Sequence, residues 1–411
     1  MTDFHPAPDG PVTGCPVRHG HFHTLYGPEF AADPRSTYAA LRRSGPVAPV
    51  EIAPGVEAML VTDYSAALQV LRSPATFVKD SRRWQALSEG KVPQDSPVLP
   101  ILAWRPSSMF ADGDRHTRLR AAVRDSLGRV EPHVLRGMVE RSADGLIDRF
   151  SPAGEADLMR DYAALLPLQV FIALAGFPVA YEGPVFAATS SVMDASGPEA
   201  ERLSAEFLGY LQDLVTHKRG RPAADVASWL VTHPSQLTDD ELVSELYLLI
   251  GAGTQPEQGL IGNMLRLLLV DDDFSEAVYN GTMLVEDSLD EVLWSEPPVA
   301  NFSVHFAKHD VSIAGIRIPA GVPVLISHSA ITEELSRATN QRVGNRAHLA
   351  WSAGPHACPA EREARLIATV AVERLLDRLP EIELAVPPEE LRWRQGPFHR
   401  CPEALPVRFT P

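Results

Sequence analysis

One stretch near the end of the chain decides the fold: Trp351-Ser352-Ala353-Gly354-Pro355-His356-Ala357-Cys358-Pro359-Ala360. Small residues surround a lone cysteine, and a helical pattern begins directly after it at Glu361. A cysteine at this junction lies near backbone N–H donors and the positive end of the helix dipole, and both favour the thiolate that ligates metal. A single thiolate on an iron held in the plane of a porphyrin is the haem-thiolate arrangement. The alternative for Cys358 is a buried structural cysteine.

The composition is that of a globular protein large enough to enclose a cofactor. The 411 residues are 45% hydrophobic and 22% charged, and the net charge of −16 argues against nucleic acid or an anionic membrane as the main partner. The three cysteines form no Cys-x-x-Cys pair, so they indicate neither a zinc site nor a disulfide framework. No signal peptide and no membrane-spanning run is visible, so we expect a cytoplasmic protein.

The periodicity of apolar residues predicts a mainly α protein with a minor β part. Helical spacing extends over most of residues 115–270, with breaks near 152–154 and 176–178, and returns at about 285–295. The sequence Thr238-Asp239-Asp240-Glu241 is a capping box that opens a long apolar helix ending near Val270. Alternating residues at 47–62 predict a hairpin, and short strands are expected at 311–318, 322–327 and within 381–409.

Three further segments have little periodicity. Residues 79–108 contain four prolines, which predicts a long loop with short helical pieces, and loops of that length tend to be functional. Residues 333–357 are expected to be irregular, and residues 1–25 to form an arm over the surface. No repeat or linker is visible, so we expect residues 1–411 to form a single domain.

The cysteine stretch and the order of the elements around it resemble the cytochromes P450 in a bacterial soluble form, over nearly the whole chain. The family motif is Phe-x-x-Gly-x-x-x-Cys-x-Gly; Trp351, Gly354 and Cys358 match it, and Ala360 replaces the last Gly. The resemblance implies the P450 fold, with haem b between the long central helix and the helix after the cysteine. It makes Cys358 the axial iron ligand and places Trp351 near its sulfur.

A second motif lies at Asp112-Gly113-Asp114-Arg115-His116-Thr117-Arg118-Leu119-Arg120. His116 and Arg120 are four residues apart and therefore share a helix face. The resemblance implies that this pair binds the haem propionates, which suits groups that donate hydrogen bonds to carboxylates. His356 is expected to do the same, and His305 stands where relatives often have an arginine. Taken singly, each histidine also fits an ordinary surface or core position.

The long helix resembles the one that crosses the distal haem face in the family, which implies haem contacts from Ala252 and Gly253. The family has an acid and a threonine where this chain has Gln255 and Pro256. That pair helps deliver the protons that cleavage of dioxygen needs, and neither Gln nor Pro is an acid. Glu257 is the candidate replacement, although it points about 200° round the helix from Gln255. Pro256 predicts a kink that frees the carbonyl of Ala252.

The family's Glu-x-x-Arg pair corresponds to Glu291-Val292-Leu293-Trp294. With Trp294 in place of the arginine, Glu291 is expected to be a buried charge that needs another partner, and Arg342 or Arg346 is the candidate. The alternative is that Glu291 and Trp294 lie on an ordinary surface turn of a helix.

The resemblance implies a haem-thiolate oxidoreductase that acts on a small secondary metabolite. It implies electron supply from a ferredoxin or flavodoxin-type protein with its reductase, and a monomer that binds no nucleic acid polymer and no membrane. The residues expected to face the substrate, each of which also fits a plain core position, are Trp84, Leu102, Trp104, Ile250, Gly251, Phe302 and Phe398.

Two reactions and one non-enzymatic role stay open at this point. Monooxygenation is the family's usual reaction. The altered pair at Gln255 and Pro256 makes oxidative radical coupling the second candidate, slightly behind monooxygenation, because coupling needs no oxygen insertion. The resemblance to actinobacterial members of the family implies, as an example, the joining of a cyclic dipeptide to a nucleobase or a second aromatic unit. The rival is a catalytically degenerate protein that keeps the fold and binds haem or a ligand for a partner, but the retained Cys358, His116, Arg120 and His356 speak against it.

Overall fold

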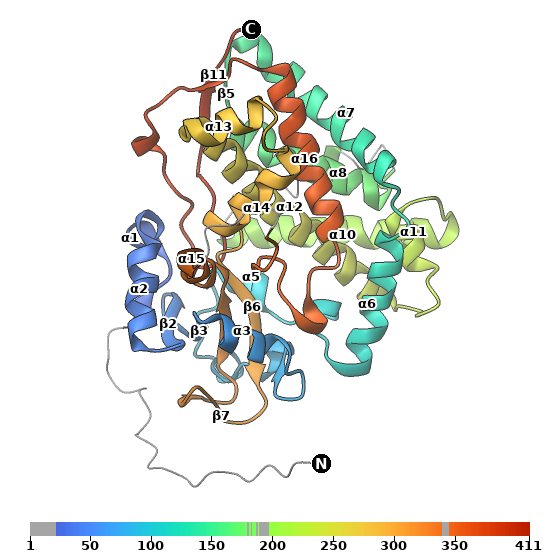
Figure 1. Ribbon diagram of the computed structural model, residues 1–411. Helices are drawn as coiled ribbons and strands as arrows, with labels where there is room; N and C mark the ends of the chain where they lie inside the picture. Colours follow the sequence, from blue (N-terminus) through green and yellow to red (C-terminus); the bar gives the residue numbers. More distant parts are fainter. Residues whose placement is uncertain (1–21, 179–180, 182, 186–187, 189–196, 339–344) are drawn as a thin grey trace, which may run out of the picture.

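The structure is a computed structural model that describes residues 22–411 except 179–180, 182, 186–187, 189–196 and 339–344. Most of the large helices lie together in one part of the molecule, with the main sheet beside them (Figure 1). The α-helices are α1 (Gly27–Ala32), α2 (Pro34–Ser44), α3 (Tyr64–Leu71), α4 (Gln85–Ser88), α5 (Leu99–Leu102), α6 (Gly113–Leu127), α7 (Pro132–Phe150), α8 (Leu165–Ala175), α10 (Gly197–Gly220), α11 (Val226–Val231), α12 (Asp239–Val270), α13 (Asp272–Tyr279), α14 (Val285–Ser295), α15 (His328–Ala338) and α16 (Glu361–Arg378). The strands are β1 (His23–Thr24), β2 (Val47–Ala53), β3 (Val56–Val61), β4 (Phe77–Val78), β5 (Glu155–Asp157), β6 (Asn301–Ala307), β7 (Val311–Ile313), β8 (Ile316–Ile318), β9 (Pro323–Ser327), β10 (Glu383–Leu384) and β11 (Pro406–Arg408).

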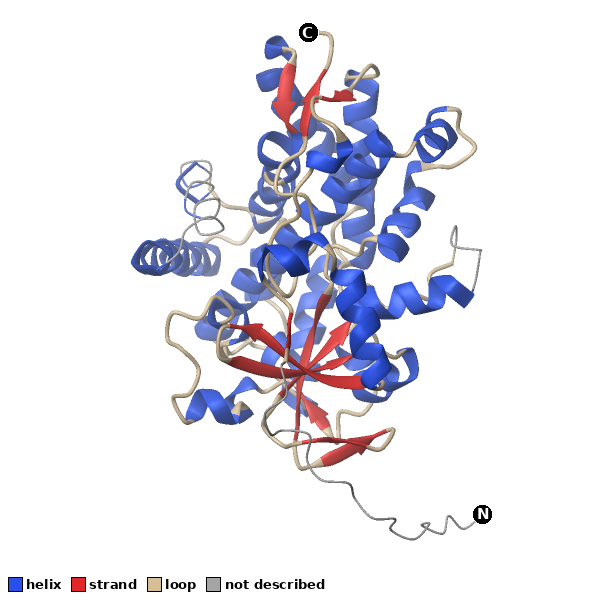
Figure 2. Cartoon of the chain, turned by 90° about the vertical axis from the view of Figure 1, so that its left-hand side faces the viewer, coloured by secondary structure: helices blue, strands red, loops and turns tan. Residues whose placement is uncertain are grey.

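The main sheet joins segments that are far apart in the sequence. Its strand order is β1-β2-β3-β9-β6-β4, and Figure 2 shows it in the lower half of the molecule with the helices above. The predicted hairpin at 47–62 is confirmed as β2 and β3, and β9 pairs in parallel with β3. Strand β6 lies antiparallel to both β9 and β4, which brings residues 77–78 next to residues 306–307.

Two small sheets complete the β part. The prediction of one strand at 311–318 is wrong, because β7 and β8 form a hairpin there. Its two turn residues, Ala314 and Gly315, have φ of 48° and 82°, and such positive values suit a tight two-residue turn. The predicted sheet pieces of the tail are confirmed as β10 and β11, and β11 also pairs with β5, which the sequence did not reveal.

Helix α12 is the long central helix, and it begins with the predicted capping box. The side chain of Thr238 accepts from the N–H of Glu241, and the carboxylate of Glu241 accepts from the N–H of Thr238. The helix continues through Pro256 and packs against α8, α10, α14 and α16. A Cβ on Gly253 would lie 2.3 Å from the ring of Phe171 on α8, so glycine allows this close approach. The kink and the freed Ala252 carbonyl stay predictions.

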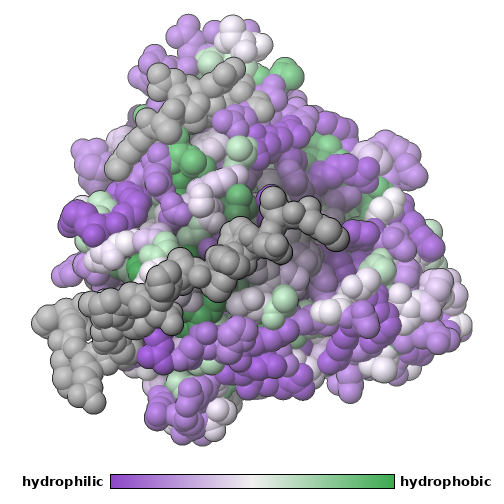
Figure 3. Space-filling model, turned by 60° about the horizontal axis from the view of Figure 1, so that its bottom comes forward, coloured by the Kyte–Doolittle hydropathy of each residue, from purple (hydrophilic) through white to green (hydrophobic). Residues whose placement is uncertain are grey.

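The apolar core has one large part among the helices and two smaller parts, one on each face of the main sheet. Helix α16 packs along α7 and also contacts α12 and α14, so the segment after Cys358 begins inside the helical layer. The face shown in Figure 3 is mainly hydrophilic, with hydrophobic residues in small separate patches. Among the described helices, none is both long and apolar enough to cross a membrane.

Two predictions of irregular structure are wrong in part. Residues 23–24 form β1 and pair with β2, and Leu25 is fully buried, so this end of the predicted arm belongs to the core. The remainder of the arm, up to residue 21, is outside the described residues. Residues 333–338 belong to α15, whereas 345–357 are irregular apart from the short turn Gly354–His356.

Candidate active site

The cysteine loop is a compact turn closed by its own backbone. The N–H of Cys358 donates to the carbonyl of Trp351 at 2.9 Å. Gly354 has φ of 71°, and a Cβ there would lie 2.2 Å from the carbonyl oxygen of Leu71, so the loop sits directly on the end of α3. Ala360, in place of the family's glycine, has φ of −121°, which any residue adopts. The substitution at 360 therefore leaves the loop unstrained at that position.

The thiol of Cys358 is enclosed yet partly accessible. The N–H of Ala360 points at its sulfur, with N and Sγ 3.4 Å apart. Burial raises the pKa of Cys358 to about 11, while the Ala360 N–H and the charge of Arg120 lower it. The backbone N–H at the start of the helix thus lowers the pKa, as expected, but desolvation is the larger effect in the protein without metal. A bound metal cation reverses this balance, since coordination replaces the proton.

A cluster of basic groups lies beside this loop. His116 and Arg120 project from α6, the rings of His116 and His356 lie 4.0 Å apart, and those of His305 and His356 lie 6.5 Å apart. Arg120 donates to the carbonyl of Ala357, which joins α6 to the cysteine loop. The predicted propionate-binding residues are therefore brought together from three segments.

The electrostatics of this cluster favour a bound anion. Burial, followed by the charges of Arg120 and Lys79, lowers the pKa of His116 to about 4. The pKa values of His305 and His356 are also well below the ordinary range, because of burial and then the charge of Lys79. The Nε2 atom of His116 is buried and has no hydrogen-bond partner among the described residues. A ligand with two carboxylates would supply the missing acceptors and negative charge.

The central helix borders open space at the predicted position. Gly251 and Ala252 are exposed although they lie in the middle of α12, and a Cβ on Gly251 would meet nothing within 4 Å. Gly253, by contrast, faces Phe171 of α8, and its predicted haem contact stays a prediction. Cys358 offers a thiolate ligand, the basic cluster offers partners for two carboxylates, and the open stretch of α12 leaves room beside the helix, so the residues present fit haem b.

Comparison with known proteins identifies the family. No protein-family model matches the chain. The chain is 34% identical over 396 residues to the cytochrome P450 monooxygenase PikC of Streptomyces venezuelae. This alignment covers 93% of this chain and 92% of PikC. The chain belongs to the cytochrome P450 family. It is therefore a P450 monooxygenase-type enzyme, and its cofactor is haem b.

Solved P450 structures share its fold. CYP154C4 from Streptomyces sp. ATCC 11861 has a TM-score of 0.85 and 28% identity, over 95% of this chain and 99% of that one. CxnD, described as the P450 for C–S bond formation in chuangxinmycin biosynthesis, has a TM-score of 0.81 and 28% identity, over 96% of this chain and all of that one. The prediction of a mainly α P450 fold is confirmed.

In this P450, a buried ion pair forms a clamp between α14 and α16 beside the segment that corresponds to the Glu-x-x-Arg pair. Asp290, rather than Glu291, is the fully buried acid, and it accepts from Arg365 of α16 at 2.6 Å. Arg346 lies 3.6 Å from Asp290, so it pairs with that residue and not with Glu291 as predicted. Glu291 is half-buried, and Arg342 lies outside the described residues.

Trp294 forms the second part of the clamp. Only 2% of its surface is exposed, and its indole N–H donates to the carbonyl of Asn345 at 2.6 Å. Its ring meets that of His348 edge to face, with 5.7 Å between the centroids. A surface turn at 291–294 is thereby excluded. The tryptophan attaches the segment before the cysteine loop to α14 through a neutral hydrogen bond.

Most of the predicted substrate residues lie in one apolar cluster beside the main sheet, namely Trp84, Leu102, Phe302 and Phe398. Trp84 and Leu102 are each 1% exposed, and Phe302 meets Phe398 edge to face. Ile250 belongs to the helical core instead. The ring of Trp104 lies under the guanidinium of Arg82, 4.4 Å away. Contact with substrate stays a prediction for all of them.

The two predicted catalytic residues differ in their surroundings. Glu257 is buried, and burial raises its pKa well above the ordinary value; the backbone of Ala368 on α16 partly opposes this. Gln255 is half-buried. Glu257 therefore faces α16, and burial favours the protonated form of its carboxyl.

Sequence reasoning missed three groups near the site: Lys79, Glu245 and Asp290. Glu245 of α12 is fully buried and accepts hydrogen bonds from the N–H and the hydroxyl of Ser108 in the long loop. Lys79 and Asp290 stand beside other charged residues in the sequence, so no local pattern distinguishes them from surface charges. For Glu245, the only signal in the sequence was an ionisable residue at a position where the pattern expects burial.

Proposed function

We propose that this P450 monooxygenates a small secondary metabolite. The observation that carries the proposal is the combination of the Cys358 thiol, the basic cluster and the open stretch of α12 in a chain similar to PikC. When bound, haem supplies one-electron redox chemistry and the activation of dioxygen.

The residues of this chain have separate tasks in that reaction. Cys358 ligates the iron, and Arg120, His116 and His356 hold the propionates. The hydroxyl of Thr254 donates to the carbonyl of Ile250 at 2.8 Å, so it is occupied by its own helix. Burial favours the protonated form of the Glu257 carboxyl, whereas Gln255 has no acidic proton to give.

Oxidative coupling is the second candidate. Gln255 and Pro256 remove the usual acid and alcohol, and a reaction that takes hydrogen from two sites and joins them needs no oxygen insertion. The similarity to CxnD, which is described as forming a C–S bond, supports keeping this candidate.

Product analysis under ¹⁸O₂ separates the two reactions. The reduced enzyme is supplied with a substrate found by its optical binding change, for example a cyclic dipeptide or another aromatic metabolite. Monooxygenation adds one ¹⁸O atom to the product. Coupling gives a product whose mass is the sum of its two parts less two hydrogens, without the label. Failure of a fully reduced, haem-loaded sample on every bound compound would favour the degenerate binding protein.

We propose a ferredoxin or flavodoxin-type electron donor with its reductase. Reconstitution with each donor in turn tests this, and NADPH-dependent turnover with only one of them identifies the class. The cytoplasmic location and the monomeric state stay predictions.

A further inference from the structure

Lys79 is a buried lysine directly beside the basic cluster. It follows β4, and the pairing of Val78 with Phe306 makes Lys79 and His305 the next two positions along the adjacent strands. Only 7% of its surface is exposed. Its backbone N–H donates to both carboxylate oxygens of Asp112, at 3.0 and 3.1 Å. Asp112 is the residue just before α6, so this contact fixes Lys79 relative to His116 and Arg120 on that helix.

The ammonium of Lys79 is only partly compensated by negative charge. Within the described part of the chain it forms no ion pair, and the Asp112 carboxylate is engaged by the backbone. Burial lowers the pKa of Lys79 to about 7, an effect that Asp112 only partly offsets. A buried unpaired ammonium is costly and is retained in proteins where a ligand or partner compensates it.

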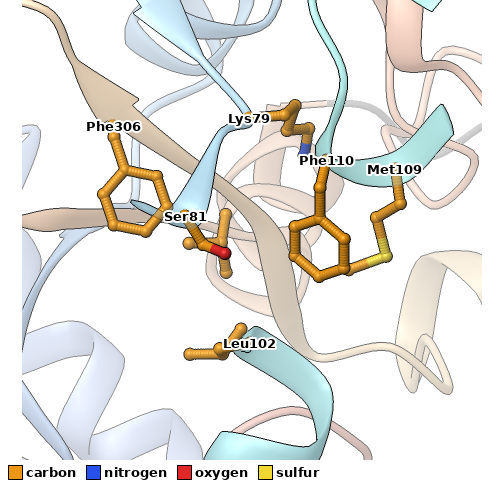
Figure 4. Close-up of a pocket in the computed structure, with 7 residues that line it drawn as sticks. Lys79, Ser81, Leu102, Met109, Phe110 and Phe306 are labelled. Atoms are coloured by element: carbon orange, nitrogen blue, oxygen red, sulfur yellow. The ribbon is translucent and has the colours of Figure 1, made fainter. Parts of the chain in front are cut away.

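Lys79 lies beside a small cavity and close to the histidine cluster. It lines this cavity of about 10 Å³, whose other walls are mostly apolar, formed by Leu102, Met109, Phe110, Val304 and Phe306 together with Ser81. In Figure 4 the nitrogen of Lys79 lies above the ring of Phe110. Its charge acts on His116, His305 and His356 alike, so it is close to all three.

His305 cannot supply a fixed charge at this place. Its Nδ1 lies 2.5 Å from the carbonyl oxygen of Ser303 and must donate to it. Burial keeps its imidazole neutral. The position where relatives often have an arginine therefore offers a hydrogen bond but no positive charge.

We infer that Lys79 binds a haem propionate together with Arg120, and that it supplies the charge that His305 lacks. The inference depends on haem b as the cofactor and does not depend on which reaction the enzyme performs. The two carboxylates of haem would then meet the guanidinium of Arg120, the imidazoles of His116 and His356, and the ammonium of Lys79, whose charged form the propionate would favour.

Haem retention by the holoenzyme tests the inference. Lys79→Met keeps the length of the side chain and removes the charge, and transfer of haem to excess apomyoglobin is followed optically. Loss of one charge-assisted hydrogen bond predicts that haem leaves at least about tenfold faster. The iron reduction potential is expected to become more negative, because a nearby positive charge stabilises the ferrous state. Lys79→Arg is expected to restore both values.

The matched control is Lys91→Met, which makes the same substitution in the same loop at an exposed lysine paired with Glu89. Lys91→Met should change neither the rate of haem loss nor the reduction potential of the iron. If Lys79→Met does not fold, Lys79→Gln and Lys79→Arg provide the same comparison of a neutral side chain with a charged one. Unchanged haem loss and potential in the neutral variants would overturn the inference. So would weakened binding of acidic substrates alone, because Lys79 would then serve a ligand in the neighbouring cavity.

Discussion

Substitution of Asp290 by asparagine should release the clamp between α14 and α16. Asp290 is fully buried and Arg365 is 5% exposed, so Asp290→Asn leaves a buried guanidinium without its counter-charge. Breaking a buried pair from one side costs about 3–5 kcal/mol. For 411 residues the unfolding entropy is about 0.9 kcal/mol/K, so a loss of about 4 kcal/mol lowers the Tm by about 5 °C. Arg365 also donates to the carbonyl of Glu286, so the substitution weakens both hydrogen bonds that Arg365 of α16 makes to α14.

Thermal unfolding of the holoprotein measures this effect, with circular dichroism for the helices and the haem absorbance for the cysteine loop. Asp148→Asn is the matched control, because Asp148 pairs with Arg378 at the same 2.6 Å but on the surface. An exposed pair contributes about 0–1 kcal/mol. The double variant Asp290→Leu with Arg365→Met should recover much of the stability, since no unpaired charge is left. If Asp290→Asn lowers the Tm no more than Asp148→Asn, the clamp does not hold the two helices together.

Three further predictions concern residues of α12 and α14. Burial raises the pKa of Glu245 to about 7, so its contribution to the free energy of unfolding is complete below about pH 4.5 and is lost as the pH rises through 7. The free energy of unfolding of Glu245→Gln, measured in urea, should therefore rise by about 3 kcal/mol relative to the wild type between pH 4.5 and 8. A difference between the two proteins that stays constant with pH would contradict this. Trp294→Phe removes the indole N–H from the carbonyl of Asn345 and should cost about 1–3 kcal/mol with faster haem loss, whereas unchanged haem retention would show that this bond does not support the cysteine loop. Gly253→Ala places a methyl group against Phe171 and should cost about 1–3 kcal/mol by thermal unfolding, while Gly251→Ala, in open space, serves as its control.

The sequence predicted the elements that carry strong local signals. The capping box at Thr238 located the start of α12, the Pro54-Gly55 turn located the β2–β3 hairpin, and the helix after Cys358 begins where the pattern begins. These features depend on neighbours within a few residues, so periodicity and turn chemistry are sufficient to find them.

Long-range compensation was not predictable from local pattern. The shift of the buried acid from Glu291 to Asp290 is a single position, and it depends on Arg365, which lies 75 residues further along the chain. Lys79 approaches the histidine cluster only because β4 pairs with β6. The ionisation of Cys358 was predicted from the helix terminus, but burial, which depends on the whole fold, has the larger effect.

Ligation of the iron by Cys358 is the central claim, and the optical spectrum of the reduced protein with carbon monoxide tests it most directly. The wild type should show the carbonyl band typical of a thiolate ligand, and Cys358→Ala should lose that band. Cys401→Ala, which removes the other described cysteine, should keep it. A histidine-type or thiol-type band in the wild type, or a thiolate band that persists in Cys358→Ala, would contradict the assignment of this loop as the haem-thiolate site.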